Sequence, residues 1–297
     1  MTGPEIDVRG LQPWGGLPPA PLERARVVVA GIPYDGSAVY RRGAAEAPAA
    51  IRRLSAVMPP LDEHGRRFTG LTVHDLGDLD LGQSVESGWR AVADRLAAVP
   101  PSAFLTVLGG DHCCAIPVLA AQARRHPGLR VLWVDAHPDL CEWSRGGRWT
   151  CGCALRRAVE VAELDSRSLV LVGCRDFDAE EVDWLEAGGS CVVTAADLAA
   201  DPQAAIARLT ATLAGGPVHV SFDIDALDPA HAPGTEIPAA GGLTTRNALD
   251  LLQTVAAEGA LVGLDVCEVA PALDHADITT LAALKLIFET WGRLGDR

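Results

Sequence analysis

The residues of this chain best suited to chemistry follow a short apolar run. Residues 131–134 lead into Asp135, His137 and Asp139, which alternate with other residues. The apolar run is typical of a parallel strand covered on both faces, and open α/β sheets place their sites where such strands end. Alternate side chains of an extended segment point the same way, so these three can converge. Carboxylate and imidazole suit manganese, iron or zinc, although this segment alone equally allows a turn with a hydrogen-bonded histidine.

Two further strand ends carry the same kind of side chain. His112 follows the apolar run 104–108, and Asp223 and Asp225 follow the run 218–222. Four carboxylates crowded at one sheet edge raise one another's pKa, and two divalent cations would balance their charge. Six protein ligands are too many for one catalytic ion that keeps an open position, so the pattern predicts two ions about 3.5–4 Å apart. The predicted ligands are His112, Asp135, His137, Asp139, Asp223 and Asp225.

The elements that must position these residues are apolar strands alternating with helices. Strands are expected at 26–31, 71–75, 104–108, 130–134, 168–172, 191–194, 218–222 and 261–266. Helices are expected at 44–54, from Ser84 to about 98, after His112 to about 125, through Arg156 to 163, and at 202–213, 246–258 and 277–294. The alternation is typical of right-handed βαβ units, so we expect an α/β fold with roughly eight parallel strands. Residues 1–24 are interpreted as an extended, proline-punctuated lead-in and residues 25–297 as one catalytic domain.

Composition restricts the class of protein. The hydrophobic content of 48% supports a sizeable core, and no apolar run approaches the length of about 20 residues that a membrane span needs. The first residues, rich in Pro and Gly, do not resemble a signal peptide, so a cytoplasmic protein is expected, with its eight cysteines as reduced thiols. A net charge of −14 argues against nucleic acid as a partner and is compatible with a cationic substrate.

Three blocks of sequence resemble the signatures of the ureohydrolase family, which comprises arginase, agmatinase and their relatives. They are Gly-Gly-Asp-His at 109–112, Asp-Ala-His-Pro-Asp at 135–139 and Ser-Phe-Asp-Ile-Asp-Ala-Leu-Asp-Pro at 221–229, with supporting blocks at 31–35, 232–235, 241–246 and 265–268. The resemblance implies a three-layer α/β/α fold with an eight-stranded parallel sheet, two Mn²⁺ ions, and hydrolysis of a guanidino compound to urea and an amine. It also implies a homo-oligomer, a trimer or a hexamer. Zinc deacetylases share a similar fold but use one metal, and they would not need the second set of ligands.

The same resemblance implies a role for each site residue. One ion is expected on His112, Asp135, Asp139 and Asp223, and the other on Asp135, His137, Asp223 and Asp225. Glu268 is expected to bind the planar guanidinium and hold its carbon over the nucleophile. Asp139 is expected to carry a proton from the attacking water to the leaving amine.

The C-terminal block at 271–280 and the segment 155–158 resemble the agmatinase and guanidino-acid hydrolase branch of the family. The asparagine that reads arginine in arginases is replaced here by Cys141. Asp178 resembles a position that contacts an α-amino group, or else caps a helix that begins there. Four loop residues are further candidates for substrate contacts. Arg145 and Arg148 could pair with a substrate carboxylate, and Glu142 and Glu236 could attract the ammonium group of agmatine. Alternatively, all four are solvated loop charges.

Two departures from the family pattern lie around the predicted substrate mouth. Cys151 stands where the family usually has a histidine thought to relay protons, and a thiol with a pKa of about 8.5 is a poorer relay at pH 7. Formiminoglutamate hydrolases also lack this histidine. The loops 44–48 and 235–240 differ from the usual pattern as well. We therefore expect an agmatinase-like metallohydrolase with an atypical substrate. The alternatives are a hydrolase of a guanidino acid, a hydroxyguanidine or a formimino compound, and a metal-binding homologue that has lost catalysis because of Cys151.

Overall fold

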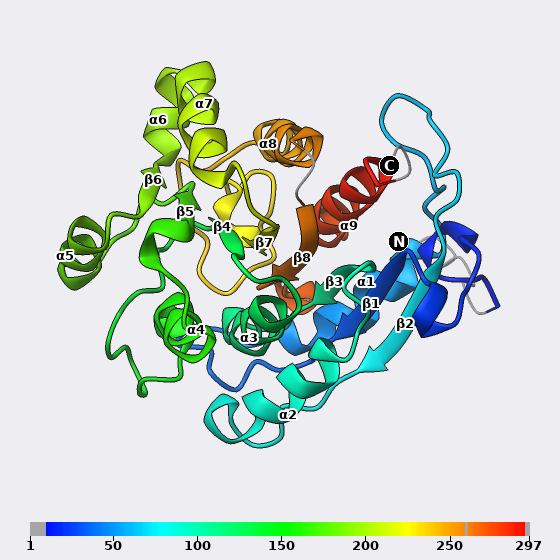
Figure 1. The fold of residues 1–297 in the computed structure, drawn as a ribbon, viewed down its shortest axis with the longest axis horizontal. Coiled ribbons are helices and arrows are strands. Elements are labelled where there is room, and N and C mark those ends of the chain that lie inside the picture. Colours follow the sequence, from blue (N-terminus) through cyan, green and yellow to red (C-terminus); the bar gives the residue numbers. More distant parts are fainter. Residues whose placement is uncertain (1–9, 259–260, 295–297) are drawn as a thin grey trace.

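An all-parallel sheet forms the middle layer of the protein (Figure 1). The computed structural model describes residues 10–258 and 261–294, and in this part of the chain eight strands form one sheet in the order β2-β1-β3-β8-β7-β4-β5-β6. The strands are β1 (Val27–Gly31), β2 (Val73–Asp78), β3 (Phe104–Leu108), β4 (Arg130–Val134), β5 (Leu169–Val172), β6 (Cys191–Val193), β7 (Val218–Asp223) and β8 (Leu261–Cys267). The expected eight-stranded parallel α/β fold is confirmed.

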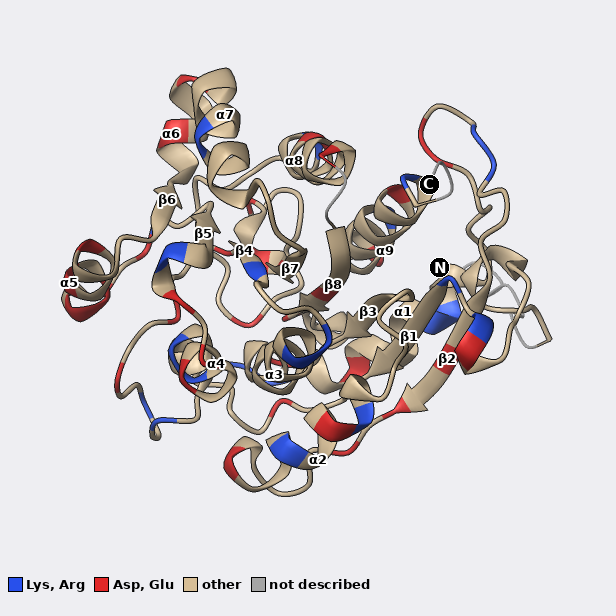
Figure 2. Ribbon diagram, viewed as in Figure 1, with Lys and Arg blue, Asp and Glu red and all other residues tan. Residues whose placement is uncertain are grey.

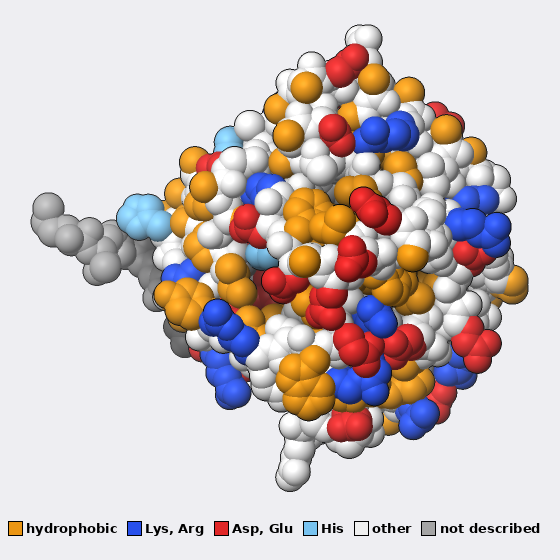
Figure 3. Space-filling model, turned by 90° about the vertical axis from the view of Figure 1, so that its left-hand side faces the viewer, with side chains coloured by type: hydrophobic (Ala, Val, Ile, Leu, Met, Phe, Trp, Pro, Cys, Tyr) orange, Lys and Arg blue, Asp and Glu red, His pale blue; other side chains and the backbone are white. Residues whose placement is uncertain are grey.

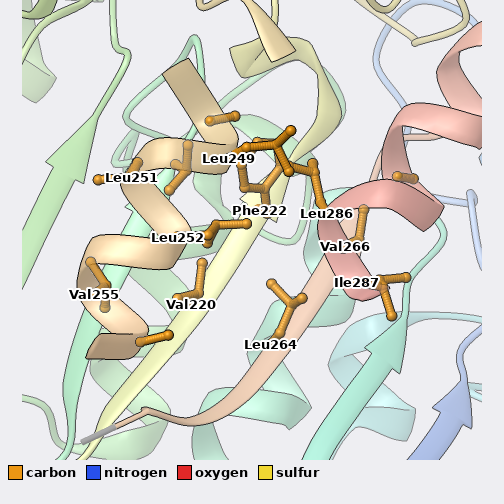
Figure 4. Packing of buried hydrophobic residues seen from close by; sticks show 14 of the residues in the cluster. Val220, Phe222, Leu249, Leu251, Leu252, Val255, Leu264, Val266, Leu286 and Ile287 are labelled. Atoms are coloured by element: carbon orange, nitrogen blue, oxygen red, sulfur yellow. The ribbon is translucent and has the colours of Figure 1, made fainter. Parts of the chain in front are cut away.

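Helices cover both faces of the sheet because successive side chains of each central strand are apolar on both sides. In β1, Val28 and Ala30 join the core beneath α2 (Val85–Ala97), α3 (Ala115–Arg125) and α4 (Ala154–Ala162). Val27 and Val29 join the opposite core, which is closed by α1 (Ala47–Ser55), α7 (Pro202–Leu213), α8 (Thr245–Ala257) and α9 (Ile278–Gly292). Figure 4 shows side chains of α8 and α9 meeting those of β7 and β8 in this second core. The three layers hold the strand ends rigidly.

Three elements differ from the expectation. The helix α6 (Ala195–Ala200) was not predicted, because its six residues are too few to show a periodicity; its signal is Thr194, whose hydroxyl caps the N–H of Asp197. The strand β2 begins two residues later than expected and continues to Asp78, because this edge strand is only half-buried and lacks a clear apolar pattern. The helix expected at 44–54 is divided into a 3-10 turn at Ala44–Glu46 and α1, with Pro48 in the first turn, where no amide donor is needed.

The first nine residues of the expected lead-in lie outside the described residues. Residues 10–24 contain 3-10 turns at Trp14–Gly16 and Leu22–Arg24 and pack against the domain. The Trp14 ring is 3% exposed and lies 5.4 Å from the ring of Trp291 in α9. This part of the lead-in therefore contributes to the second core. No helix in the described part of the chain is both long and apolar enough to cross a bilayer.

An ion pair fastens the loop before β2 to α8, and it predicts a pH dependence of stability. Arg246 and Gln253 donate hydrogen bonds to Glu63, and these bonds lower the pKa of Glu63 to about 2. A carboxylate whose pKa is lowered by folding stabilises the protein above its unfolded pKa of about 4.3, and this contribution disappears as the pH falls towards 2. Because Arg246 is half-exposed, we expect Glu63→Gln to lower the free energy of unfolding by only about 1 kcal/mol at pH 7, and by less at pH 3. Urea unfolding of both proteins at the two pH values tests this, and an equal difference at both would contradict it.

Candidate metal centre and substrate cavity

The candidate site lies at the carboxyl ends of four strands that are neighbours in the sheet. The order β3-β8-β7-β4 brings together segments that are far apart in the sequence, because the chain passes from β3 through α3 to β4 and leaves room for β7 and β8 between them. Such a crossover point is where open α/β sheets form clefts. His112 follows β3, Glu268 follows β8, Asp223 ends β7, and Asp135 follows β4.

His112 is the centre of the first group of potential ligands. Its Nδ1 lies 3.0 Å from Asp135 Oδ2, 3.2 Å from Asp223 Oδ2 and 3.3 Å from Asp139 Oδ2, yet it forms no hydrogen bond. Its Nε2 lies 3.1 Å from Ser221 Oγ, and the Ser221 hydroxyl donates to Asp265. Since that hydroxyl accepts from Nε2–H, the lone pair of Nδ1 faces the carboxylates, as a metal ligand requires.

His137 is the centre of the second group. Its Nδ1 lies 3.2 Å from Asp225 Oδ2 and 3.5 Å from Asp135 Oδ1. Asp135 therefore lies between the two histidines, with one oxygen near each ring. Asp223 directs one oxygen towards His112, and its other oxygen accepts the amide N–H of Asp225 at 2.8 Å. All six residues predicted as ligands thus meet in one cluster.

The cluster is a buried concentration of negative charge. Asp135, Asp139, Asp223 and Asp225 are each at most 5% exposed. Burial, and then the neighbouring carboxylates, raise the pKa of Asp139 and of Asp223 well above the usual range. The donor set of imidazole nitrogen and carboxylate oxygen, with the unbonded Nδ1 of His112, fits divalent transition-metal ions. Such ions would remove the charge repulsion that the folded chain creates.

The backbone is in an uncommon conformation at two residues of the site. Asp139 has a φ of +55° and Glu268 a φ of +63°, values that cost a non-glycine residue about 1–3 kcal/mol and that cluster at functional sites. Glu268 is held in place by its own amide, which donates to the carbonyl of Gly110, and by its Oε1, which accepts the amide N–H of His112 at 2.8 Å. Its Oε2 is buried without a hydrogen-bond partner.

A cavity of about 250 Å³ opens over the cluster. Three residues predicted to be catalytic line it, namely Asp139, Cys151 and Glu268. Burial, and then the charges of Glu268 and Glu236, raise the pKa of Cys151 well above its usual value, so the thiol stays protonated near neutral pH. The wall also includes Glu236, beside Cys151, and Asp176, Phe177, Asp178 and Ile237. Figure 3, which views the molecule from the side of α5 (Ala179–Gly188), shows acidic side chains gathered in the middle of this face.

Of the residues expected to contact the far end of a substrate, the structure places some in the cavity wall and others outside it. Asp178 lines the cavity and is also the N-cap residue of α5, where its amide donates to Glu181. Arg145, Arg148 and Glu142 do not line it, which favours the alternative that they are solvated loop charges. Arg148 pairs with Glu142 at 2.6 Å, and Arg145 lies in a separate hollow. Figure 2 shows charges of both signs along this loop before α4.

Two features of the site were not recognised in the sequence. One is the support of His112 by Ser221 and Asp265, for which the signal was polar residues within the otherwise apolar strands β7 and β8. The other is the depth at which Glu236 lies, since its side chain is buried and faces the cavity. Nothing in the local pattern of the loop 235–240 distinguishes a buried glutamate from a solvated one.

Comparisons with known proteins agree with this architecture. The model of the family described as "Arginase family" matches residues 25–292. Proclavaminate amidinohydrolase of Streptomyces clavuligerus is 36% identical over 283 residues, which cover 91% of this chain and 88% of that protein. Its solved structure superposes with a TM-score of 0.86 and covers 96% of this chain and 97% of that one. Guanidinobutyrase of Pseudomonas aeruginosa is 32% identical (91% and 87% covered), and agmatinase of Bacillus cereus is 33% identical (90% and 91% covered).

Proposed function

The chain belongs to the arginase family, and on this premise we propose that it is a metal-dependent amidinohydrolase that cleaves a guanidino compound into urea and an amine. The observation that carries the proposal is the meeting of two histidines and four aspartates beneath a cavity whose wall includes Glu268. Its relatives named proclavaminate amidinohydrolase, guanidinobutyrase and agmatinase support the reaction class.

Two Mn²⁺ ions are the proposed cofactors. One would be held by His112, Asp135, Asp139 and Asp223, and the other by Asp135, His137, Asp223 and Asp225. When bound, such a pair of ions lowers the pKa of water so that a nucleophile is available at neutral pH.

The protein's own groups would orient the substrate and move its proton. Glu268 is anchored through Oε1 and has a free Oε2, so it can accept hydrogen bonds from a planar guanidinium and fix its carbon above the metal cluster. Asp139 lies both in the cavity wall and next to the cluster. It is therefore positioned to take a proton from the attacking water and deliver it to the leaving amine.

The charge of the outer cavity supports a substrate with a cationic far end. Among the described residues that line the cavity, none is Lys or Arg, whereas Asp176 and Asp178 are acidic. A substrate carboxylate would therefore be repelled, and an ammonium group would be attracted. We accordingly propose an agmatine-like substrate in preference to a guanidino acid.

Urea release from the Mn²⁺-loaded protein tests this proposal across agmatine, guanidinobutyrate, guanidinopropionate, arginine and hydroxyarginine, with formamide release from formiminoglutamate measured in parallel. We expect kcat/KM for agmatine to exceed that for guanidinobutyrate at least about 10-fold, since one favourable charge contact of about 1.4 kcal/mol suffices. A preference for a carboxylated compound would contradict the proposed substrate while leaving the reaction class intact. No turnover of any compound, with two metals bound, would instead favour the metal-binding homologue that has lost catalysis.

A further inference from the structure

We propose that Glu236 is a second substrate-binding carboxylate, which acts together with Glu268 to hold the guanidinium group. This inference rests on the function proposed above and identifies how the site would recognise its cation. The two glutamates lie in different loops, Glu268 directly after β8 and Glu236 between β7 and α8. Both line the cavity, and both are almost completely buried, at 4% and 2% exposure.

The distances between the two carboxylates suit a single planar cation. One oxygen of Glu236, one oxygen of Glu268 and the sulfur of Cys151 all lie within 4.8 Å of one another. A nitrogen that bears two hydrogens about 120° apart and donates both at about 2.8 Å reaches two acceptors up to about 4.8 Å apart. One terminal –NH₂ group of a guanidinium could therefore donate to both glutamates at once.

Glu236 is oriented by the backbone around it. Its Oε1 accepts the amide N–H groups of Val39 at 2.6 Å and of Tyr40 at 2.5 Å. The Arg41 guanidinium does not pair with the carboxylate but donates to the main-chain carbonyls of Thr235 and Glu236, which fixes the loop from outside. With Oε1 fixed in this way, Oε2 lies towards Cys151, 3.9 Å from its sulfur.

Burying the carboxylates of Glu236 and Glu268 in one cavity costs free energy unless a cation binds between them. The contacts of Glu236 in the described structure are amide N–H groups and a thiol, and no Lys or Arg lies among the described residues of the cavity wall. A buried carboxylate without a cationic partner is expensive, and two in one cavity repel each other as well. A substrate cation bound between Glu236 and Glu268 would relieve both costs. Cys151 lies directly beside this second carboxylate, with its sulfur 3.9 Å from Glu236 Oε2.

The substitution Glu236→Gln tests the proposal, because glutamine keeps an oxygen that can accept the two amides and removes the charge. We expect KM for agmatine to rise about 10- to 100-fold, as for the loss of a charge-assisted hydrogen bond, while kcat changes much less. The dissociation constant of guanidinium chloride, measured by calorimetry at millimolar concentration on the Mn²⁺-loaded protein, should rise by a similar factor. Glu236→Asp, which keeps the charge but withdraws it by one methylene, should raise KM less than Glu236→Gln. Glu186→Gln is the matched control, since it removes a charge from an exposed position of α5.

Several outcomes would overturn the proposal. An unchanged KM and an unchanged guanidinium affinity in Glu236→Gln would mean that the side chain only supports the 39–41 loop. Loss of a bound metal ion in that variant would mean that Cys151, Glu236 and Glu268 hold a cation of their own.

If the wild-type protein releases urea from no guanidine, the proposed function fails, but calorimetry of guanidinium with wild type and variant still decides the role of Glu236. If Glu236→Gln has a lowered melting temperature, its KM is not interpretable. The KM and the guanidinium affinity of Glu236→Asp, compared with those of the wild type, then decide whether Glu236 binds the substrate.

Discussion

Replacing Asp135 with asparagine should abolish urea release, with a loss of more than about 1000-fold in kcat/KM. Asp135 directs one oxygen to His112 and the other to His137. Its carboxylate therefore links the two groups of potential ligands. Loss of a mere supporting partner of a metal ligand costs about 10- to 100-fold, and loss of a shared ligand should cost more. The metal content, measured by atomic emission after gel filtration, should fall from two ions per chain to fewer than one.

Thermal unfolding supplies a second measurement that does not depend on activity. Burial opposes the charge of Asp135, but His112 and His137 outweigh it and lower the pKa of this carboxyl, so without metal Asp135→Asn should lower the melting temperature. With added Mn²⁺ the wild type should gain stability through binding to the folded state, and the variant should gain much less. Asp94→Asn, at an exposed position of α2, is the control. A variant that retained two ions and full activity would refute the assignment of Asp135 as a shared ligand.

Glu268→Gln should lower kcat/KM by about 100-fold or more and leave the metal content at two ions per chain. Glutamine retains an oxygen that can accept the His112 amide, so the loop after β8 should keep its conformation. The guanidinium would lose charge-assisted hydrogen bonds of about 1.5–3 kcal/mol each, together with the alignment of its carbon above the metals. Steady-state urea release from agmatine, with metal analysis of the same samples, measures both effects.

The comparison with Glu236→Gln distinguishes the two glutamates. Because Glu268 lies closer to the metal ligands, its replacement should lower kcat as well as raise KM, whereas replacement of Glu236 should act mainly on KM. A decrease in kcat/KM of less than about 5-fold in Glu268→Gln, with metals bound, would argue that Glu268 does not position the substrate.

The candidate metal centre can be predicted from the sequence because its signal is local. A run of buried apolar residues followed by Asp or His identifies a strand end, and the carboxyl ends of parallel strands lie on one edge. This is why the sequence predicts His112, the segment 135–139 and the segment 223–225 together as metal ligands. The fold class followed from the same alternation of strands and helices.

The order of the strands was not readable, because packing between distant segments decides it. The sequence does not show that β8 and β7 lie between β3 and β4, and this order is what brings Glu268 beside His112. The short helix α6 was not predicted, and the half-buried edge strand β2 was predicted with shifted bounds, because few of their residues contact the core.

The charged residues of the loops show most clearly what the sequence leaves open and the tertiary structure decides. Arg145, Arg148, Glu142 and Glu236 looked alike in the sequence, as polar residues in irregular segments. In the folded chain, Arg148 and Glu142 neutralise each other outside the cavity, while Glu236 is buried inside it. The sequence by itself thus determined the fold class and the candidate metal ligands, because both depend on residue types along the strands and at their ends, and its resemblance to the ureohydrolase family indicated the reaction class. Only the tertiary structure decided which loop charges face the cavity, because the amides that hold Glu236 come from a distant part of the sequence and burial depends on the whole chain.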